Sequence, residues 1–429
     1  SGDTIALASG ASQTGFGRTG TVDWQTTKKT GDFTAVNGQG YFVDTTSTVI
    51  TMTMPSGSAG AIVSIQDYNK TFDNNNFTIA PASGEKINGG IADGSLIIAT
   101  EGQGLTFVYV DSTVGWKTVH ENEFIAGGSN FIAASGGTET TSGDFKIHTF
   151  TGPGTFTVSQ ISNTAADNTV SYLVIAGGGS GANSGAGDGG GGGGAGGYRE
   201  YRAPVSGCYS VSPLNGNPGG TAVTITAQAY PITVGAGGTA ALANCGNSGA
   251  NSVFSTVTST GGGGGGKAST VGIAGGSGGG GGGGAPGGSP AGAGNTPSTS
   301  PSQGFPGGLG GGGTPNYTGG GGGGATAAGT GGPGASVGGS GGAGATTSIN
   351  ATPTQRGGGG GGSTYSNPGS PGAFLGGAGG AGGGGAAQTR VPTWPTAAVA
   401  GTTNTGGGGG GGQDAAANGG SGIVIIRYK

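Results

Sequence analysis

The stretch GGGGGGKAST at residues 261–270 belongs to a glycine-rich region that decides the fold of this chain. Glycine provides 116 of the 429 residues, and 92 of these glycines follow residue 170. A glycine run has no Cβ to bury and loses much backbone entropy on folding. It is therefore either a disordered linker or a segment ordered by hydrogen bonds to its neighbours. The clearest runs lie at 261–266, 278–284, 310–313, 319–324, 357–362, 382–385 and 406–412.

An ordered glycine run has a known geometry, the extended left-handed polyglycine II helix. It has three residues per turn and rises about 3.1 Å per residue, so six or seven residues span about 20 Å. This helix makes no internal hydrogen bonds, so each N–H group must find a partner in a neighbouring helix. The glycine runs therefore predict a bundle of such helices at 177–197 and 261–412.

Charge divides the chain into two regions of different composition. Residues 1–170 hold 7 Lys and Arg against 15 Asp and Glu, whereas residues 171–429 hold 7 against 3. The net charge of −4 gives no reason to expect binding to nucleic acid or to an anionic membrane. No apolar stretch approaches the roughly 18–20 residues of a membrane span. The chain begins at Ser1 without a recognisable signal peptide, which suggests a processed chain or a piece of a longer one.

Short runs rich in β-branched and aromatic residues predict an all-β domain over residues 30–123. Turn clusters separate these runs, and their spacing is typical of a small β-sandwich or barrel. We expect residues 1–29 to form a connector and residues 124–143 a linker. The predicted strands lie at 40–44, 49–54, 61–65, 76–79, 95–99, 105–110 and 115–119.

The region 144–429 is predicted to be one glycine-rich domain on a β base formed by residues 144–260 and 421–429. Alternating segments at 144–151 and 155–161 flank Gly-Pro-Gly at 152–154, which predicts a hairpin. The apolar strand IVIIRY at 423–428 needs a partner, which we expect in the sheet containing 172–176. We expect no α-helix of note. Further strands are predicted at 198–201, 221–226, 231–234 and 253–260.

The return of the chain to its final strand constrains the path of the bundle. An even number of glycine passes brings the chain back to the sheet, and a further pair at 177–181 and 189–197 fits between two strands. If the passes alternate in direction, five inserts lie far from the sheet. These inserts are 182–188, 267–274, 314–318, 345–356 and 386–405, between passes expected at 261–266, 275–284, 307–313, 319–324, 331–344, 357–362, 376–385 and 406–412.

These inserts carry the side chains that we consider candidates for receptor binding. Tyr, Trp and Arg are the residues that recognition surfaces favour. The alternative is that the aromatic residues cap the open ends of the bundle. We expect Phe305, Tyr365, Phe374 and Leu375 to pack on the sheet side. The candidate residues are Lys267, Asn316, Tyr317, Asn350, Arg356, Arg390 and Trp394.

Several motifs together resemble the glycine-rich domain of bacteriophage tail-fibre and tail-tip proteins of the marine-phage type. They are HTFTGPGTFTV at 148–158, YLVIAGGG at 172–179, AGGYR at 195–199, ITVGAGG at 232–238 and GSGIVIIRY at 420–428. Residues 40–116 resemble β domains that precede it in such fibres. The resemblance implies a virion tail appendage that binds a bacterial surface glycan or outer-membrane protein through loops between polyglycine helices. It also implies a homotrimer that contacts other tail proteins.

The resemblance leaves a second function open, a purely structural fibre or decoration protein of a virion or an extracellular filament. Ice binding by a polyglycine bundle is a third alternative. It would require a flat, regular face, and Trp394 in the long insert 386–405 argues against it. Neither leading function needs nucleic acid, membrane insertion or a cofactor.

Catalytic motifs are weak in this sequence. GGSGG at 275–279 and 338–342 matches a nucleophile elbow, but such matches arise by chance here and no strand and helix flank them. The run 261–267 resembles a phosphate-binding loop, but Ala268 replaces the Ser or Thr that binds Mg²⁺. We therefore predict no enzyme activity and no metal site. Structural roles are expected for His120, His148 and the turn at 73–76, whereas Cys208 and Cys245 fit either a disulfide or two free thiols.

Overall fold

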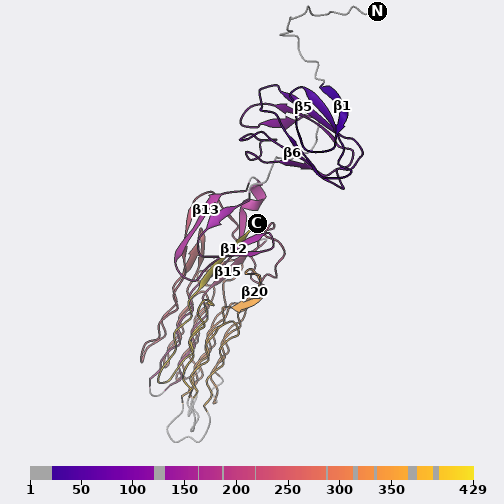
Figure 1. The fold of residues 1–429 in the computed structure, drawn as a ribbon. Helices are drawn as coiled ribbons and strands as arrows, with labels where there is room; N and C mark the ends of the chain where they lie inside the picture. Colours follow the sequence, from indigo (N-terminus) through magenta and orange to yellow (C-terminus); the bar gives the residue numbers. More distant parts are fainter. Residues whose placement is uncertain are drawn as a thin grey trace, which may run out of the picture. The chain divides into compact units, whose positions relative to one another are not determined.

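A computed structural model describes residues 22–119 and 131–429, except 163, 186–187, 218, 287, 313–316, 333–335, 366–373 and 390–395. The chain forms two compact units, Ser1–Asn130 and Phe131–Lys429 (Figure 1). In the described residues the secondary structure is β apart from a short 3₁₀ turn, η1 (Ala165–Asn168). The prediction of an all-β fold without notable α-helix is confirmed.

The first unit is a sandwich in which the early chain alternates between two sheets. Each of the first strands is followed by one in the opposite sheet, so β1, β3 and β5 are mutually parallel, as are β2, β4 and β6. One sheet contains β1 (Asp23–Lys29), β3 (Gln39–Val43), β5 (Ile62–Asp67), β8 (Gly104–Tyr109) and β9 (Trp116–Thr118). The other contains β2 (Phe33–Thr34), β4 (Ile50–Thr53), β6 (Phe77–Ala80) and β7 (Leu96–Ile98).

The expected connector at 1–29 and the expected linker at 124–143 both contain β-strands. Strand β1 lies inside the expected connector 1–29, and the strands β10 (Ala133–Ser135) and β11 (Thr138–Ser142) lie inside the expected linker 124–143. Strands β1 and β11 are mostly polar and exposed, and β10 is a short Ala-Ala-Ser segment, so all three lack the alternating apolar pattern that marks a half-buried strand.

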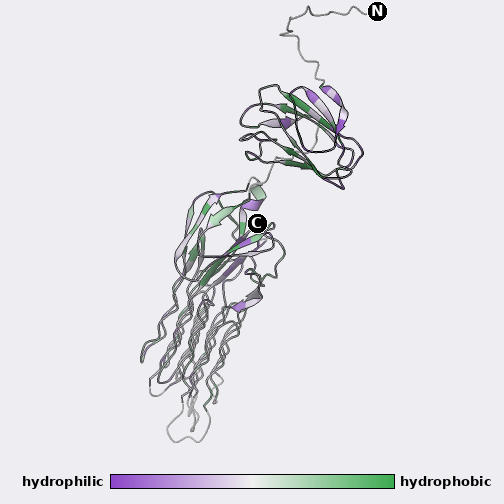
Figure 2. Ribbon diagram, in the orientation of Figure 1, coloured by the Kyte–Doolittle hydropathy of each residue, from purple (hydrophilic) through white to green (hydrophobic). Residues whose placement is uncertain are grey.

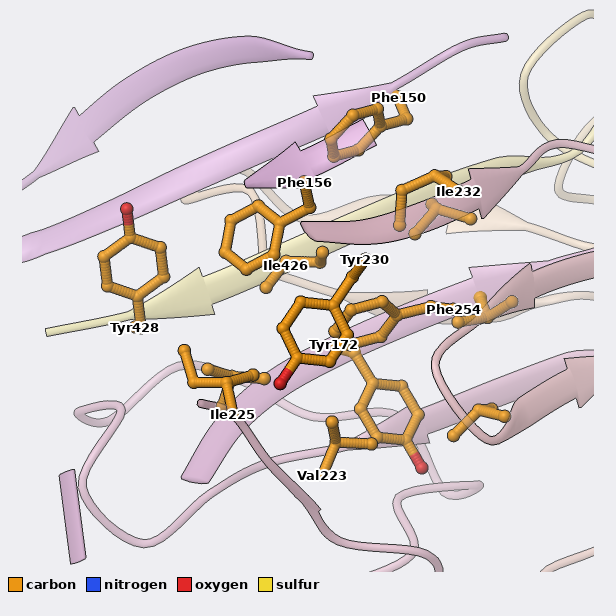
Figure 3. Close-up of a cluster of buried hydrophobic side chains, with 14 of the residues drawn as sticks. Phe150, Phe156, Tyr172, Val223, Ile225, Tyr230, Ile232, Phe254, Ile426 and Tyr428 are labelled. Atoms are coloured by element: carbon orange, nitrogen blue, oxygen red, sulfur yellow. The ribbon is translucent and has the colours of Figure 1, made fainter. Parts of the chain in front are cut away.

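The base of the second unit is also made of two sheets. One has the order β11-β12-β22-β14-β15, with β16 paired to β14, and the other has the order β10-β13-β17-β18-β19. A cluster of buried apolar side chains, drawn in Figure 3, is contributed by both sheets. The remaining strands are β12 (Phe145–Phe150), β13 (Gly154–Gln160), β14 (Thr169–Ile175), β15 (Tyr198–Tyr201), β16 (Val223–Thr224), β17 (Ala229–Thr233), β18 (Ser252–Phe254), β19 (Val257–Ser259) and β22 (Ile423–Tyr428).

The predicted hairpin around residues 152–154 is wrong. Strand β12 pairs with β11 and β22, whereas β13 pairs with β10 and β17, so the Gly-Pro-Gly turn carries the chain between sheets. Phe150 and Phe156 both enter the core between the sheets, and this shared burial satisfies the alternating pattern as well as a hairpin would. The strand expected at 253–260 is instead the hairpin β18–β19, turning at Ser255 with φ of 52°.

Strand β22 occupies the middle of its sheet. It pairs antiparallel with β12 on one side and β14 on the other, and all six of its residues are buried. The predicted pairing of the terminal strand with 172–176 is confirmed. Beside it, His148 contacts the Gly136 carbonyl through Nδ1 (2.7 Å) and the Tyr428 hydroxyl through Nε2 (2.9 Å). His148 thus has the structural role expected of it.

Candidate functional site

The glycine-rich segments are held together by a backbone hydrogen-bond pattern that repeats every three residues. In segment 189–197, every third amide donates to the same neighbouring segment, which is the signature of a helix with three residues per turn. Successive donors point to three different neighbours. The bonds are Gly191 and Gly194 to the carbonyls of Gly266 and Gly263, Gly192 and Ala195 to those of Gly320 and Gly323, and Gly193 and Gly196 to those of Gly409 and Gly406.

Segment 189–197 lies at the centre of a hexagonal array. It donates to 261–266, 319–324 and 406–412, and it accepts from 177–182, 277–283 and 357–363 through bonds such as Gly280 to Gly192 O. Adjacent members of this ring are bonded to each other as well, in the order 177–182, 261–266, 277–283, 319–324, 357–363 and 406–412. The array is visible as long extended segments below the sheets, in pale hydropathy colours (Figures 1 and 2).

Only glycine fits most positions of this array. A Cβ added to Gly191, Gly192 or Gly193 would lie less than 3.0 Å from a backbone oxygen of the next segment, closer than real Cβ atoms approach. The absence of side chains therefore lets the backbones come near enough to exchange N–H···O bonds in every direction. This packing confirms that the glycine runs are ordered as extended helices in a bundle.

The chain makes more passes than the glycine runs alone suggested. Segments that contain many other residues also cross the bundle, as shown by the bonds from Ile273 to Gly264 O and from Val399 to Ala386 O. These segments lie outside the ring, where one side is free for side chains. Because 270–275 runs back, both 261–266 and 276–283 run away from the base, and the expected alternation is wrong. The additional passes lie at 235–239, 246–250, 270–275, 289–294, 327–332, 384–388, 397–401 and 415–420.

Insert 345–356 lies at the base, contrary to expectation. It forms the hairpin of β20 (Ala345–Thr347) and β21 (Thr354–Arg356). The Thr347 hydroxyl donates to Glu200 Oε1 (2.6 Å), and Arg427 Nη1 donates to the Ile349 carbonyl (3.4 Å). Asn350 and Arg356 are therefore separated from the other candidates, and Arg356 is buried at 6% exposure. The extra passes reverse the direction that the glycine runs had implied.

Lys267 and Tyr317 do lie at turns far from the base. The Lys267 ammonium donates to the Ala243 carbonyl (3.4 Å). The Tyr317 ring stacks on Tyr365 with centroids 6.4 Å apart, and the Tyr365 amide donates to the Tyr317 carbonyl. Asn316, Arg390 and Trp394 lie outside the described residues.

Four residues were expected to pack on the sheet side of the bundle, and this placement was right for only one of them, Phe305. Tyr365, Phe374 and Leu375 lie at the far turns, where Leu375 bonds to Ser336 and forms a bridge with Val337. Phe305 is near the base, since its amide donates to Gly324 O. The other three residues were misplaced because the additional passes change which end of the bundle each turn occupies.

Polar residues within a few positions of the glycine segments form a second far-end group that the sequence reasoning missed. Asn183 Nδ2 donates to the Asp414 carbonyl (2.8 Å), and Gln388 Nε2 donates to Asp414 Oδ2 (3.1 Å). Partial burial raises the pKa of Asp188 in the same set of turns. The signal that could have found them is the presence of Asn, Gln or Asp in the short breaks between glycine-rich segments.

The segments outside the ring leave one side of segment 261–266 without a neighbouring segment. The amide of Gly261 is bonded to the Asn251 side chain (2.9 Å), and the buried Gly264 amide has no partner within the described residues. At the far end of the same side, Cys245 Sγ contacts Thr270 Oγ1 (3.3 Å). Side chains thus replace backbone partners where the array ends.

The described residues hold no group of three His, Cys, Asp or Glu side chains placed to bind a metal ion. Among them, no helix has the length and apolar character to cross a membrane. Cys208 and Cys245 are both free, which decides between the two alternatives that the sequence left open. The contacts seen among the described far-end residues are hydrogen bonds and one aromatic stack.

A family model described as a glycine-rich domain matches residues 150–429. This match covers more than half of the chain, so the chain belongs to the glycine-rich domain family. No curated protein matches the sequence.

Proposed function

We propose that this chain is a phage tail-fibre or tail-tip adhesin whose far-end turns bind a bacterial surface receptor without covalent chemistry. The observation that carries the proposal is the distribution of side chains in the bundle. Glycine fills the inner segments, and Lys267, Tyr317 and Asp414 appear where the segments turn. A rigid scaffold that presents variable turns is a common way to build a recognition surface.

The adhesin would act as a homotrimer in the virion tail, next to other tail proteins. Its receptor would be a surface glycan or an outer-membrane protein of the host. The stacked pair Tyr317 and Tyr365 supports this role, because tyrosine offers large contact area at low entropic cost.

A specific observation also favours the second function, a structural fibre or decoration protein. The far-end side chains bond to one another, as Asn183 and Gln388 both do to Asp414. Side chains that satisfy each other in this way are suited to capping the open ends of the bundle.

The exchange of residues 390–395, which lie outside the described residues, tests the adhesin function. Thr389 and Thr396 are joined by an antiparallel bridge, so the segment between them can be replaced by that of a related chain of different host range. Adsorption of the particle should then follow the new segment. The matched control replaces only the exposed residues 351–353 of the base turn in the hairpin β20–β21 and leaves the buried Ile349 in place. Unchanged host range after the first exchange, with an intact fold, would favour the structural function.

Paired tyrosine variants separate the two functions further. If the pair binds receptor, Tyr317→Ala and Tyr365→Ala should lower adsorption and leave the melting temperature nearly unchanged. If the pair is a cap, the melting temperature should fall and adsorption should persist.

A further inference from the structure

The outer face of the first sheet in the N-terminal unit carries an exposed aromatic pair. Trp24 on β1 has 41% of its surface exposed, although tryptophan is usually largely buried. Its ring centroid lies 5.0 Å from that of Phe42 on β3, with the ring planes tilted by 34°. Phe42 is itself only half-buried. Both rings therefore present apolar surface to solvent on the same side of the sheet.

Glycine at position 40 makes this arrangement possible. Gly40 is the register partner of Trp24 in the parallel pair β1–β3. A Cβ at Gly40 would lie within 3.0 Å of two atoms of the Trp24 ring. The indole thus lies flat over the strand, and a larger residue would lift it away from Phe42.

Uncharged polar groups continue the same face toward the centre of the sheet. Gly40 pairs with Ser64, which pairs with Thr106, and their hydroxyl groups are hydrogen-bonded to each other (2.8 Å). Phe42 pairs with Gln66, whose amide donates to the Gly102 carbonyl (3.0 Å). Ser64 is only 4% exposed, so the partly exposed Thr106 and Gln66 provide the polar half of the face beside the aromatic half. The Lys28–Asp44 ion pair (2.6 Å) lies beside the ends of the same strands, β1 and β3.

We propose that this face, centred on Trp24 and Phe42, is a binding site for neutral pyranose sugars of a surface polysaccharide. A pyranose ring has an apolar C–H face that packs on the electron-rich face of an aromatic ring. Its rim of hydroxyl groups exchanges hydrogen bonds with Thr and Gln side chains such as Thr106 and Gln66. The two halves of the face match these two parts of a sugar. The site is separate from the far-end turns and does not depend on their function.

The test measures binding of the full chain to soluble neutral oligosaccharides of hexoses and N-acetylhexosamines, by titration and on an array. Trp24→Ala should weaken binding by about tenfold or more, whereas Trp24→Phe, which keeps an aromatic ring, should stay within about threefold. Gly40→Ala should also weaken binding, because the new Cβ displaces the indole. The matched control is Ile97→Ala, since Ile97 is 57% exposed on β7 of the other sheet.

The melting temperature of the first unit, measured for every variant, separates loss of the site from loss of the fold. The proposal is overturned if no oligosaccharide binds at millimolar concentration, or if Trp24→Ala and Ile97→Ala bind equally. It is also overturned if Trp24-dependent binding to host cells survives periodate oxidation of the cell surface and is abolished by protease, because the partner would then be a protein.

Discussion

The two units of this chain are ordered by different means. The sandwich at residues 22–119 is held by buried side chains such as Met52, Phe77 and Phe107, all with no exposed surface. The centre of the bundle has almost no side chains. Its stability comes from N–H···O bonds that join segment 189–197 to its six neighbours and the neighbours to one another. A protein interior can therefore be built from backbone alone, provided that every polar group finds a partner.

The difference also explains why the bundle needs its β base. Isolated extended helices gain no hydrophobic burial, so something must start and align them. The base does so through β14 and β15, which lead directly into and out of segments 177–182 and 189–197. The core of the base is made of aromatic and branched side chains, and it resembles the sandwich more than the bundle it supports.

The largest expected effect comes from removing β22. Deletion of residues 423–429 leaves both β12 and β14 without their central partner and exposes the core beneath. We expect the second unit to become insoluble, whereas the first should keep its own melting transition. Soluble fraction and calorimetry check this result. Deletion of Lys429 alone is the control, and cooperative folding of the longer deletion would refute the role given to β22.

Phe107→Ala should damage the sandwich alone. It removes a fully buried ring, and such changes cost about 3–5 kcal/mol. In calorimetry we expect the transition of the first unit to shift down strongly and that of the second to stay in place. Equal shifts of both transitions would show that the units are energetically coupled.

Gly193→Ala tests the interior of the bundle, which is built from backbone and not from side chains. The added Cβ would meet the Gly179 carbonyl in the centre of the array, and overpacking of this kind costs about 1–3 kcal/mol or more. The same substitution at Gly152, which has open space around its Cβ position, is the control and should change stability by less than about 1 kcal/mol. Similar melting temperatures for the two variants would contradict a side-chain-free array.

The smallest expected effect is an opposite response of the two units to acid. In the first unit, a hydrogen bond from Lys28 (2.6 Å) lowers the pKa of Asp44 to about 2, below its ordinary 3.8. The stability that this ion pair adds is complete above the ordinary pKa and is lost as the pH falls toward 2. Asp44→Asn should remove this loss in melting curves recorded below pH 4.

In the second unit, burial raises the pKa of Glu200 above its ordinary 4.5, although Ser212 and Thr347 donate hydrogen bonds to it. The folded state then holds the proton more tightly than the unfolded state, so stability should rise as the pH falls through the raised folded-state pKa toward the ordinary 4.5. Glu200→Gln should flatten this rise. A rise of equal size in the variant would assign it to another group.

The sequence predicted the class of the fold and the identity of its closing strand. The positions of β3 to β9 followed from apolar alternation and turn residues, and an apolar strand at 423–428 needs a partner wherever the chain places it. The glycine runs predicted extended helices, because segments without side chains can approach closely enough to exchange backbone hydrogen bonds with several neighbours.

The path of the bundle was decided only by the tertiary structure. Segments such as 270–275 and 397–401 look like loops in the sequence, yet they complete the outer shell. A segment at the surface of the array needs glycine only on its inner side, so its sequence carries little of the pattern. For the same reason the sequence misplaced Arg356 and Tyr365. Sequence alone thus determined what each segment is made of, whereas packing determined which end of the bundle each turn occupies.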